Sequence, residues 1–195
     1  MRFFKLFLIS VFGLAVVIFL LSLLLPPNAV VERIGVIESP KDTVAAHLTD
    51  LRRWKSWYPM FRQDTLFQLQ ISEPASGVGA WAHWTSKTDV TDTGRLTITG
   101  IDDRGMHYHL ATRGGQHADG GFEIKSTPDG NGTALHWYVT SHLGYLPWWK
   151  FFGFVADRVL GPQMETALNA LRADCEHSIV PKQVQPADSA AAPQP

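Results

Sequence analysis

Histidine is the residue of this sequence whose type and spacing most directly suggest chemistry. The predicted sheet region carries His83, His107, His109, His117, His136 and His142. His107 and His109 are two residues apart, so on a strand they point the same way, and with His83 they could meet a zinc ion. The sequence has no H-E-x-x-H motif and no cysteine pair to support such a site. We therefore expect hydrogen-bonded or solvated strand histidines, no metal and no cofactor.

The other common reactive motifs are also missing. The sequence has no G-x-S-x-G elbow and no Walker A loop, and its single cysteine, Cys175, has the helical apolar spacing of a small core side chain. Asn131 begins an N-G-T sequon that fits a tight glycine-rich turn equally well. The 17 basic and 18 acidic side chains nearly cancel, which argues against a nucleic-acid partner. Binding is thus favoured over catalysis.

Aromatic residues form the second chemical feature. The segment LRRWKSWYPMF, Leu51 to Phe61, contains Trp54, Trp57 and Tyr58. These rings could cap an apolar ligand cavity, or they could simply fill a core, because aromatic side chains bury large areas wherever they lie. The sequence leaves both interpretations open.

The hydrophobic pattern predicts the elements that position these side chains. Residues 30–39 alternate as a strand, and Ser39 and Pro40 then predict a helix start, with Ser39 as the cap and Pro40 in the first helical position. Six further strands are expected, joined by turn residues and hence antiparallel: 65–71, 79–87, 94–101, 106–112, 120–127 and 133–141. Residues 148–177 predict a long helix, with a kink or break at Gly161-Pro162.

Both ends of the chain differ in character from this domain. Arg2 and Lys5 precede an uncharged run, residues 6–25, that is long enough to span a bilayer as a helix. We expect residues 1–27 to be a transmembrane anchor, with a cleaved signal sequence as the alternative. Basic residues at the amino end favour a cytoplasmic N-terminus, which places the domain outside the cytoplasm, in the periplasm of a bacterium. Residues 28–180 form the expected domain, and 181–195 an expected disordered tail.

The element order and three groups of segments resemble the polyketide cyclase/dehydrase branch of the START-like (SRPBCC) superfamily. The segments are VERIGVIESPKDTVAAHLTDLRRWKSWYP, then VGAWAHWTSK with GRLTITGI, then GTALHWYV with GPQMETALNALRADCE. The resemblance covers about Val30 to Glu176. It implies an α+β helix-grip fold, in which a curved antiparallel sheet wraps around a carboxy-terminal helix. It also implies a deep apolar cavity, used in different relatives for lipids, sterols, plant hormones or polyketides, and no universal catalytic residue.

Strand alternation then identifies residues that would line this cavity, since every second side chain faces the helix. They are Trp54, Trp57, Tyr58, Ile98, Tyr108, Leu110, Phe122, Trp137, Met164, Leu168 and Leu171. The sequence predicts a membrane-anchored domain that binds a small apolar ligand, such as a lipid or isoprenoid. Two alternatives stay open: a cyclase in which Tyr108 or His83 moves protons, and a ligand-free interaction module. Protein partners cannot be named.

A second aromatic segment, YLPWWKFFGF, Tyr145 to Phe154, lies between the last strand and the long helix. In an anchored domain it could form a membrane-facing gate, because Trp and Tyr favour the headgroup region. Packing under the edge of the sheet is the more ordinary expectation, since contiguous exposed apolar patches are uncommon.

Overall fold

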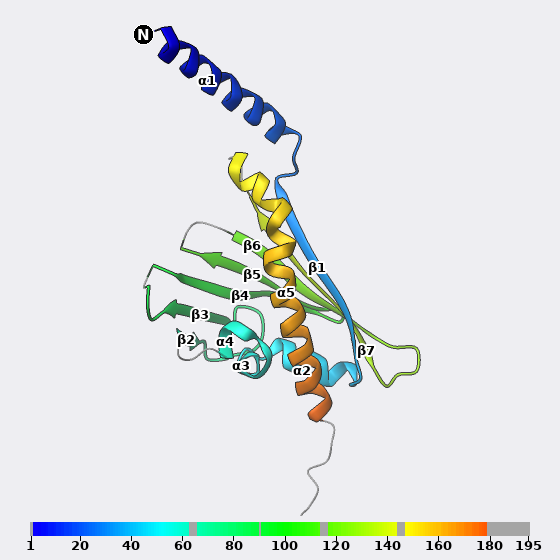
Figure 1. The fold of residues 1–195 in the computed structure, drawn as a ribbon. Coiled ribbons are helices and arrows are strands. Elements are labelled where there is room, and N and C mark those ends of the chain that lie inside the picture. Colours follow the sequence, from blue (N-terminus) through cyan, green and yellow to red (C-terminus); the bar gives the residue numbers. More distant parts are fainter. Residues whose placement is uncertain (1, 63–65, 90, 114–116, 144–146, 179–195) are drawn as a thin grey trace, which may run out of the picture.

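The computed structural model describes residues 2–62, 66–89, 91–113, 117–143 and 147–178, with the side chains of Arg2 and of 147–154 outside that description. The chain begins with an apolar helix, α1 (Arg2–Leu23), whose side chains are almost all exposed. Its segment Phe3–Leu23 is long and apolar enough to cross a membrane, a property shared by anchors and by signal sequences. Figure 1 shows α1 standing away from the folded domain.

Seven antiparallel strands form one sheet in the order β1-β7-β6-β5-β4-β3-β2. The strands are β1 (Asn28–Ile37), β2 (Phe67–Ile71), β3 (Trp81–Ser86), β4 (Thr93–Asp102), β5 (Gly105–Thr112), β6 (His117–Ser126) and β7 (Thr133–His142). All seven predicted strands and their hairpin order are confirmed. Only β1 breaks the sequential order, because it pairs with β7 and lies at the edge of the sheet.

Three short helices connect β1 to β2. They are α2 (Lys41–Thr49), α3 (Trp54–Trp57) and α4 (Pro59–Arg62). The predicted start of the first is wrong in detail: Pro40 itself occupies the N-cap position of α2, and no side chain caps the helix. The Ser39 hydroxyl is buried without a hydrogen-bond partner among the described residues, and the Ser39 backbone oxygen accepts a hydrogen bond from the Thr133 hydroxyl at 2.7 Å.

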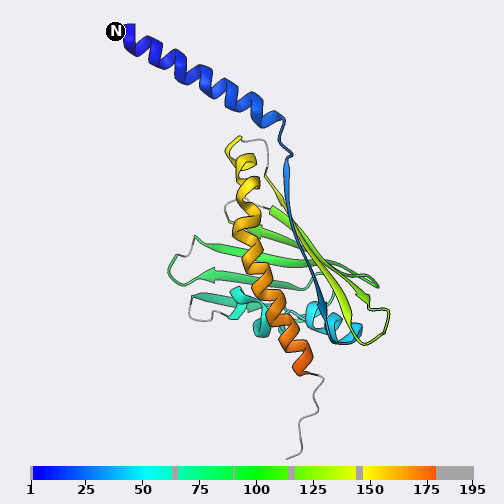
Figure 2. The ribbon, with the colours of Figure 1, turned by 45° about the vertical axis from the view of Figure 1, so that its right-hand side comes forward.

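The long helix α5 (Pro147–His177) crosses the concave face of the sheet (Figures 1 and 2). Of the predicted kink or break at Gly161-Pro162, the break is absent, since the helix continues through Pro162. Proline removes one helix hydrogen bond, which leaves the carbonyl of Arg158 without its partner. Both Arg158 and Pro162 lie on the exposed side of the helix, where water can satisfy that carbonyl, so the interruption is tolerated.

Helix α5 also covers the edge strand β1. The Arg172 side chain of the helix donates from Nε to the carbonyl oxygen of Val36 at 3.0 Å. Arg33 of β1 forms ion pairs with Asp157 at 2.8 Å and with Glu165 at 2.9 Å, both on α5. An open strand edge is a template for pairing with another chain, and these contacts cover part of it.

Candidate ligand-binding interior

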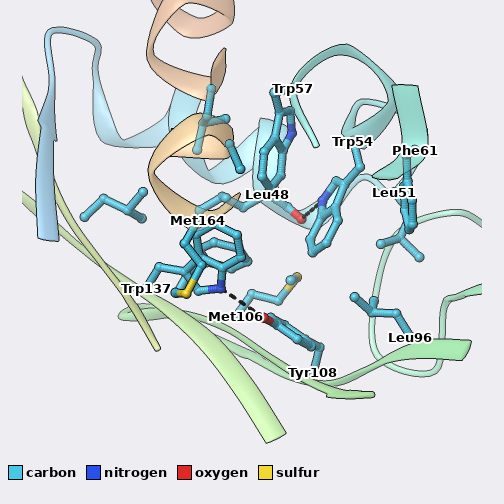
Figure 3. Packing of buried hydrophobic residues seen from close by; sticks show 14 of the residues in the cluster. Leu48, Leu51, Trp54, Trp57, Phe61, Leu96, Met106, Tyr108, Trp137 and Met164 are labelled. Carbon is cyan, nitrogen blue, oxygen red and sulfur yellow. Dashed lines mark hydrogen bonds between the residues drawn. The ribbon is translucent and has the colours of Figure 1, made fainter. Parts of the chain in front are cut away.

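A cluster of aromatic rings lies between the sheet and its helices (Figure 3). The Trp54 ring lies 4.9 Å from Trp57 and 5.4 Å from Tyr58, measured between ring centroids. From the sheet, Phe122 and Trp137 lie 5.0 Å apart, and Trp137 lies 6.4 Å from Trp57. Short helix α3 and strands β6 and β7 thus meet through their aromatic side chains.

All the predicted lining residues face this interior, but they do so to different degrees. Buried members are Trp54, Trp57, Ile98, Tyr108, Phe122, Trp137, Met164 and Leu171. Tyr58, Leu110 and Leu168 are partly buried and pack against the others. The end of the interior around Trp54 and Trp57 is therefore shielded from solvent, whereas Leu110 and Leu168 keep some exposed surface.

Strand glycines make room for two of the rings. Gly120 pairs with Tyr108 across β5 and β6, and a Cβ at Gly120 would collide with the Tyr108 ring. Gly94 pairs with Trp84 across β3 and β4, and a Cβ at Gly94 would collide with the Trp84 ring. Each tyrosine or tryptophan ring lies over the bare backbone of its cross-strand neighbour, an arrangement that pins register and ring position.

Polar atoms within the interior are few and come from the same rings. The Trp137 indole Nε1 donates to the Tyr108 hydroxyl oxygen at 2.9 Å. Trp54 Nε1 donates to the backbone oxygen of Leu48 at 2.8 Å. The Trp57 indole N–H is buried and has no partner among the described residues. The interior is therefore apolar with a small number of hydrogen-bond donors.

Burial also controls the ionisation of the two interior tyrosines. Removal from water raises the pKa of Tyr58 to about 12. Burial raises the pKa of Tyr108 further, assisted by the nearby Tyr58 and opposed by the hydrogen bond from Trp137. Both hydroxyls are neutral near pH 7, so they can donate a hydrogen bond but are poor bases.

The strand histidines occupy the opposite, convex face of the sheet, as expected. His107 Nδ1 lies 2.8 Å from the Tyr138 hydroxyl. Asp119 is placed between two imidazoles, with His109 Nδ1 at 2.7 Å and His142 Nε2 at 2.8 Å. These two hydrogen bonds, that of His142 first, hold the pKa of Asp119 below its usual range.

The suggested trio of His83, His107 and His109 is not brought together. His83 pairs across β3 and β4 with Arg95, whereas His109 pairs across β4 and β5 with Thr97. Among the residues with defined positions, no group of three or more His, Cys, Asp or Glu side chains is arranged to hold a metal ion. His83 lies on the convex side, opposite Ala82 and Trp84, so its suggested role in moving protons within the cavity is wrong.

Three residues of the interior were not among the lining residues predicted from the sequence. Phe61, Trp84 and Met106 belong to the buried cluster. Trp84 and Met106 follow the same alternation as the predicted residues, so strand period alone could have identified them. Phe61 belongs to the segment LRRWKSWYPMF, and its ring lies 5.9 Å from Trp54.

The suggested gate, Tyr145 to Phe154, lies outside the described side chains, and the suggested tail outside the described residues.

Cys175 behaves as the core residue that its spacing predicted. The side chain is fully buried on α5. Burial, together with the neighbouring carboxylates of Asp174 and Glu176, raises the pKa of the thiol to about 12. Because the thiolate is the reactive species, this cysteine is a poor nucleophile.

A curved antiparallel sheet gripping a long carboxy-terminal helix over an aromatic interior defines a START-like helix-grip protein, a fold that supports a ligand-binding or cyclase-like role. The chain belongs to the polyketide cyclase / dehydrase and lipid transport family, whose model matches residues 29–176. A search of curated protein sequences returned no match.

Solved structures share the fold at low sequence identity. The Zhui aromatase/cyclase of Streptomyces sp. R1128 is 17% identical, with a TM-score of 0.57 over 78% of this chain and 96% of that one. A START superfamily protein from Mycobacterium smegmatis is 12% identical, with a TM-score of 0.55 over 77% and 99%. A norcoclaurine synthase of Thalictrum flavum is 11% identical, with a TM-score of 0.56 over 77% and 96%. At these identities the likeness establishes the fold alone.

Proposed function

We propose that this chain is a membrane-anchored START-like domain that binds a small apolar ligand, such as a lipid or isoprenoid, between the sheet and α5. The observation that carries the proposal is the apolar interior itself. Its walls come from the concave face of the sheet, from α3 and from α5, and its partly exposed members, Tyr58, Leu110 and Leu168, pack against the buried cluster. A concave, mostly apolar surface with a few polar groups is typical of small-molecule sites.

The anchor is the apolar helix α1. Its exposed apolar side chains need an apolar environment, and the helix ends only a few residues before β1 begins at Asn28. We propose that residues 1–27 anchor the domain, residues 28–180, with the N-terminus in the cytoplasm and the domain outside it, in the periplasm of a bacterium. A cleaved signal would leave the same domain free, and the mass of the mature chain separates the two cases.

A cyclase-like enzyme is the second candidate, and one specific observation bears on it. The neutral Tyr108 hydroxyl, whose pKa is raised by burial, could supply a proton or a hydrogen bond to a reacting carbonyl. Among the described residues, the Tyr108 hydroxyl is hydrogen-bonded to the Trp137 indole, and the groups that perturb its pKa are Tyr58, Trp137 and Tyr138, so no carboxylate or histidine is paired with it as a base. Binding is therefore the better-supported function.

Native mass spectrometry tests the proposal. The full chain, extracted gently from its membrane into detergent, should carry a discrete and stoichiometric extra mass that lipid analysis assigns to an apolar compound. A mass of the chain alone, without an adduct even after incubation with membrane lipids, would favour an interaction module whose interior is filled by its own side chains. Turnover of an added substrate would instead favour the enzyme.

A further inference from the structure

The interior holds more hydrogen-bond donors than acceptors. Its side-chain nitrogen and oxygen atoms are the indole N–H groups of Trp54, Trp57, Trp84 and Trp137 and the hydroxyls of Tyr58 and Tyr108. An indole nitrogen can only donate, and a phenol can donate one proton and accept. Buried donors in folded proteins almost always have an acceptor, so any donor without one needs an explanation.

The Trp57 indole N–H is a fully buried donor that lacks an acceptor among the described residues. The Trp57 side chain is 0% exposed. Trp54 shows what the same group does nearby: its ring is 4.9 Å away, and its N–H donates to the oxygen of Leu48. The two adjacent tryptophans thus differ: the N–H of Trp54 is bonded within the protein, whereas that of Trp57 has no acceptor among the described residues.

Tyr108 adds a second unused donor. Its hydroxyl oxygen accepts from Trp137, but none of the described residues accepts the proton of that hydroxyl. The residue is 4% exposed, so water from the surface does not readily replace the missing acceptor. Because its pKa is raised by burial, the hydroxyl also keeps its proton.

We infer that the ligand of this interior is an apolar molecule that carries a hydrogen-bond acceptor oxygen, such as a carbonyl, and that the oxygen is recognised by the Trp57 indole N–H. The inference rests on the proposed function and narrows its ligand class. A hydrocarbon of the same shape leaves the donor unpaired, and sites with a buried unpaired polar group discriminate against such analogues. A ligand whose only polar group is a donor is excluded for the same reason.

Two probes with the same ring skeleton test this inference on the full chain in detergent. Fluoren-9-one carries a carbonyl where fluorene carries a methylene group. We expect the ketone to bind about tenfold more tightly, which is the affinity equivalent of one hydrogen bond to an otherwise unpaired donor. Its binding should also move the indole proton resonance of Trp57 downfield. The preference should disappear in Trp57→Phe and persist in Trp54→Phe, whose N–H already has an acceptor.

The outcomes separate the two levels of the proposal. Equal affinities for both probes in the unmodified chain would overturn the acceptor inference while leaving an apolar binding site in place. A preference for the ketone that survives Trp57→Phe would overturn the role of this residue. If neither probe binds and the native mass is bare, the proposed function itself fails.

Discussion

Trp54 and Trp57 lie in ring contact, with 4.9 Å between their centroids, yet only the indole N–H of Trp54 has an acceptor. The two side chains are almost equally buried and belong to the same short helix, α3. They therefore form a matched pair in which packing is shared and hydrogen bonding differs.

This pair predicts unequal effects on stability. Replacing either tryptophan by phenylalanine removes part of a buried ring. Only Trp54→Phe also removes a hydrogen bond and leaves the Leu48 oxygen without its donor. We expect Trp54→Phe to lower the free energy of unfolding by about 1 kcal/mol more than Trp57→Phe. Chemical denaturation of the two variants in the same detergent measures the difference. Equal losses would mean that the Trp57 N–H has a partner after all.

The close approach of Tyr108 to Gly120 predicts that a single methyl group is costly. Gly120→Ala should lower the free energy of unfolding by about 1–3 kcal/mol, because the Tyr108 ring would have to move. Gly35→Ala in β1 is the matched control, since its added Cβ would meet only the Arg172 side chain at 3.7 Å, an ordinary contact. Thermal unfolding followed by circular dichroism compares the two variants. A loss of stability in Gly35→Ala as large as that in Gly120→Ala would contradict a special role for the close contact between Gly120 and the Tyr108 ring.

Asp119 predicts a dependence of stability on pH. Its pKa is lower in the folded chain, chiefly because of the hydrogen bond from His142, so it stabilises the fold above the unfolded value of about 3.9. That stabilisation is lost as pH falls through the lower, folded value. The Asp119 side chain is 56% exposed, which limits the effect to about 0.5 kcal/mol.

A double-mutant cycle of Asp119→Asn and His142→Ala isolates this interaction. Its coupling energy should be favourable at pH 6 and should fade between pH 4 and 2, within the range where Asp119 becomes protonated. Unfolding curves at several pH values supply the data. Coupling that stays constant down to pH 2 would show that the carboxylate charge is not what links the two residues.

The buried thiol of Cys175 predicts slow alkylation. With a pKa of about 12, only about one thiol in 10,000 is ionised at pH 8, and the side chain is fully buried. Iodoacetamide should therefore modify the folded chain far more slowly than the chain unfolded in urea. Intact-mass measurements over time follow the reaction. Similar rates in both states would place the thiol at the surface.

The strands could be predicted from the sequence because alternation is a local property. Met106, Tyr108 and Leu110 face inward, and His107 and His109 face outward, as period two requires. The same rule could have placed His83 on the convex side with His107 and His109, yet only the register shows how far apart across the sheet these residues lie. The distance between residues on non-adjacent strands depends on how every strand between them is paired, which a local pattern does not specify.

Local rules failed where tertiary context decided the outcome. Ser39 has the chemistry of a helix cap, but its backbone is hydrogen-bonded to Ile37 and Thr133, and its buried hydroxyl caps nothing. Pro162 has the chemistry of a helix breaker, but it lies on the exposed face of a helix held against the sheet. The unpaired N–H of Trp57 could not be anticipated either, because hydrogen-bond partners in a core depend on exact distances.

The central claim is that the interior between the sheet and α5 holds an apolar ligand. Native mass spectrometry of the full chain beside its Leu110→Trp variant tests it most directly, because Leu110 is partly buried on the concave face and a larger ring there would occupy ligand space. The account predicts a stoichiometric extra mass on the unmodified chain and its loss from a variant that remains folded by circular dichroism. A bare mass for both chains, or an unchanged adduct on both, would contradict it.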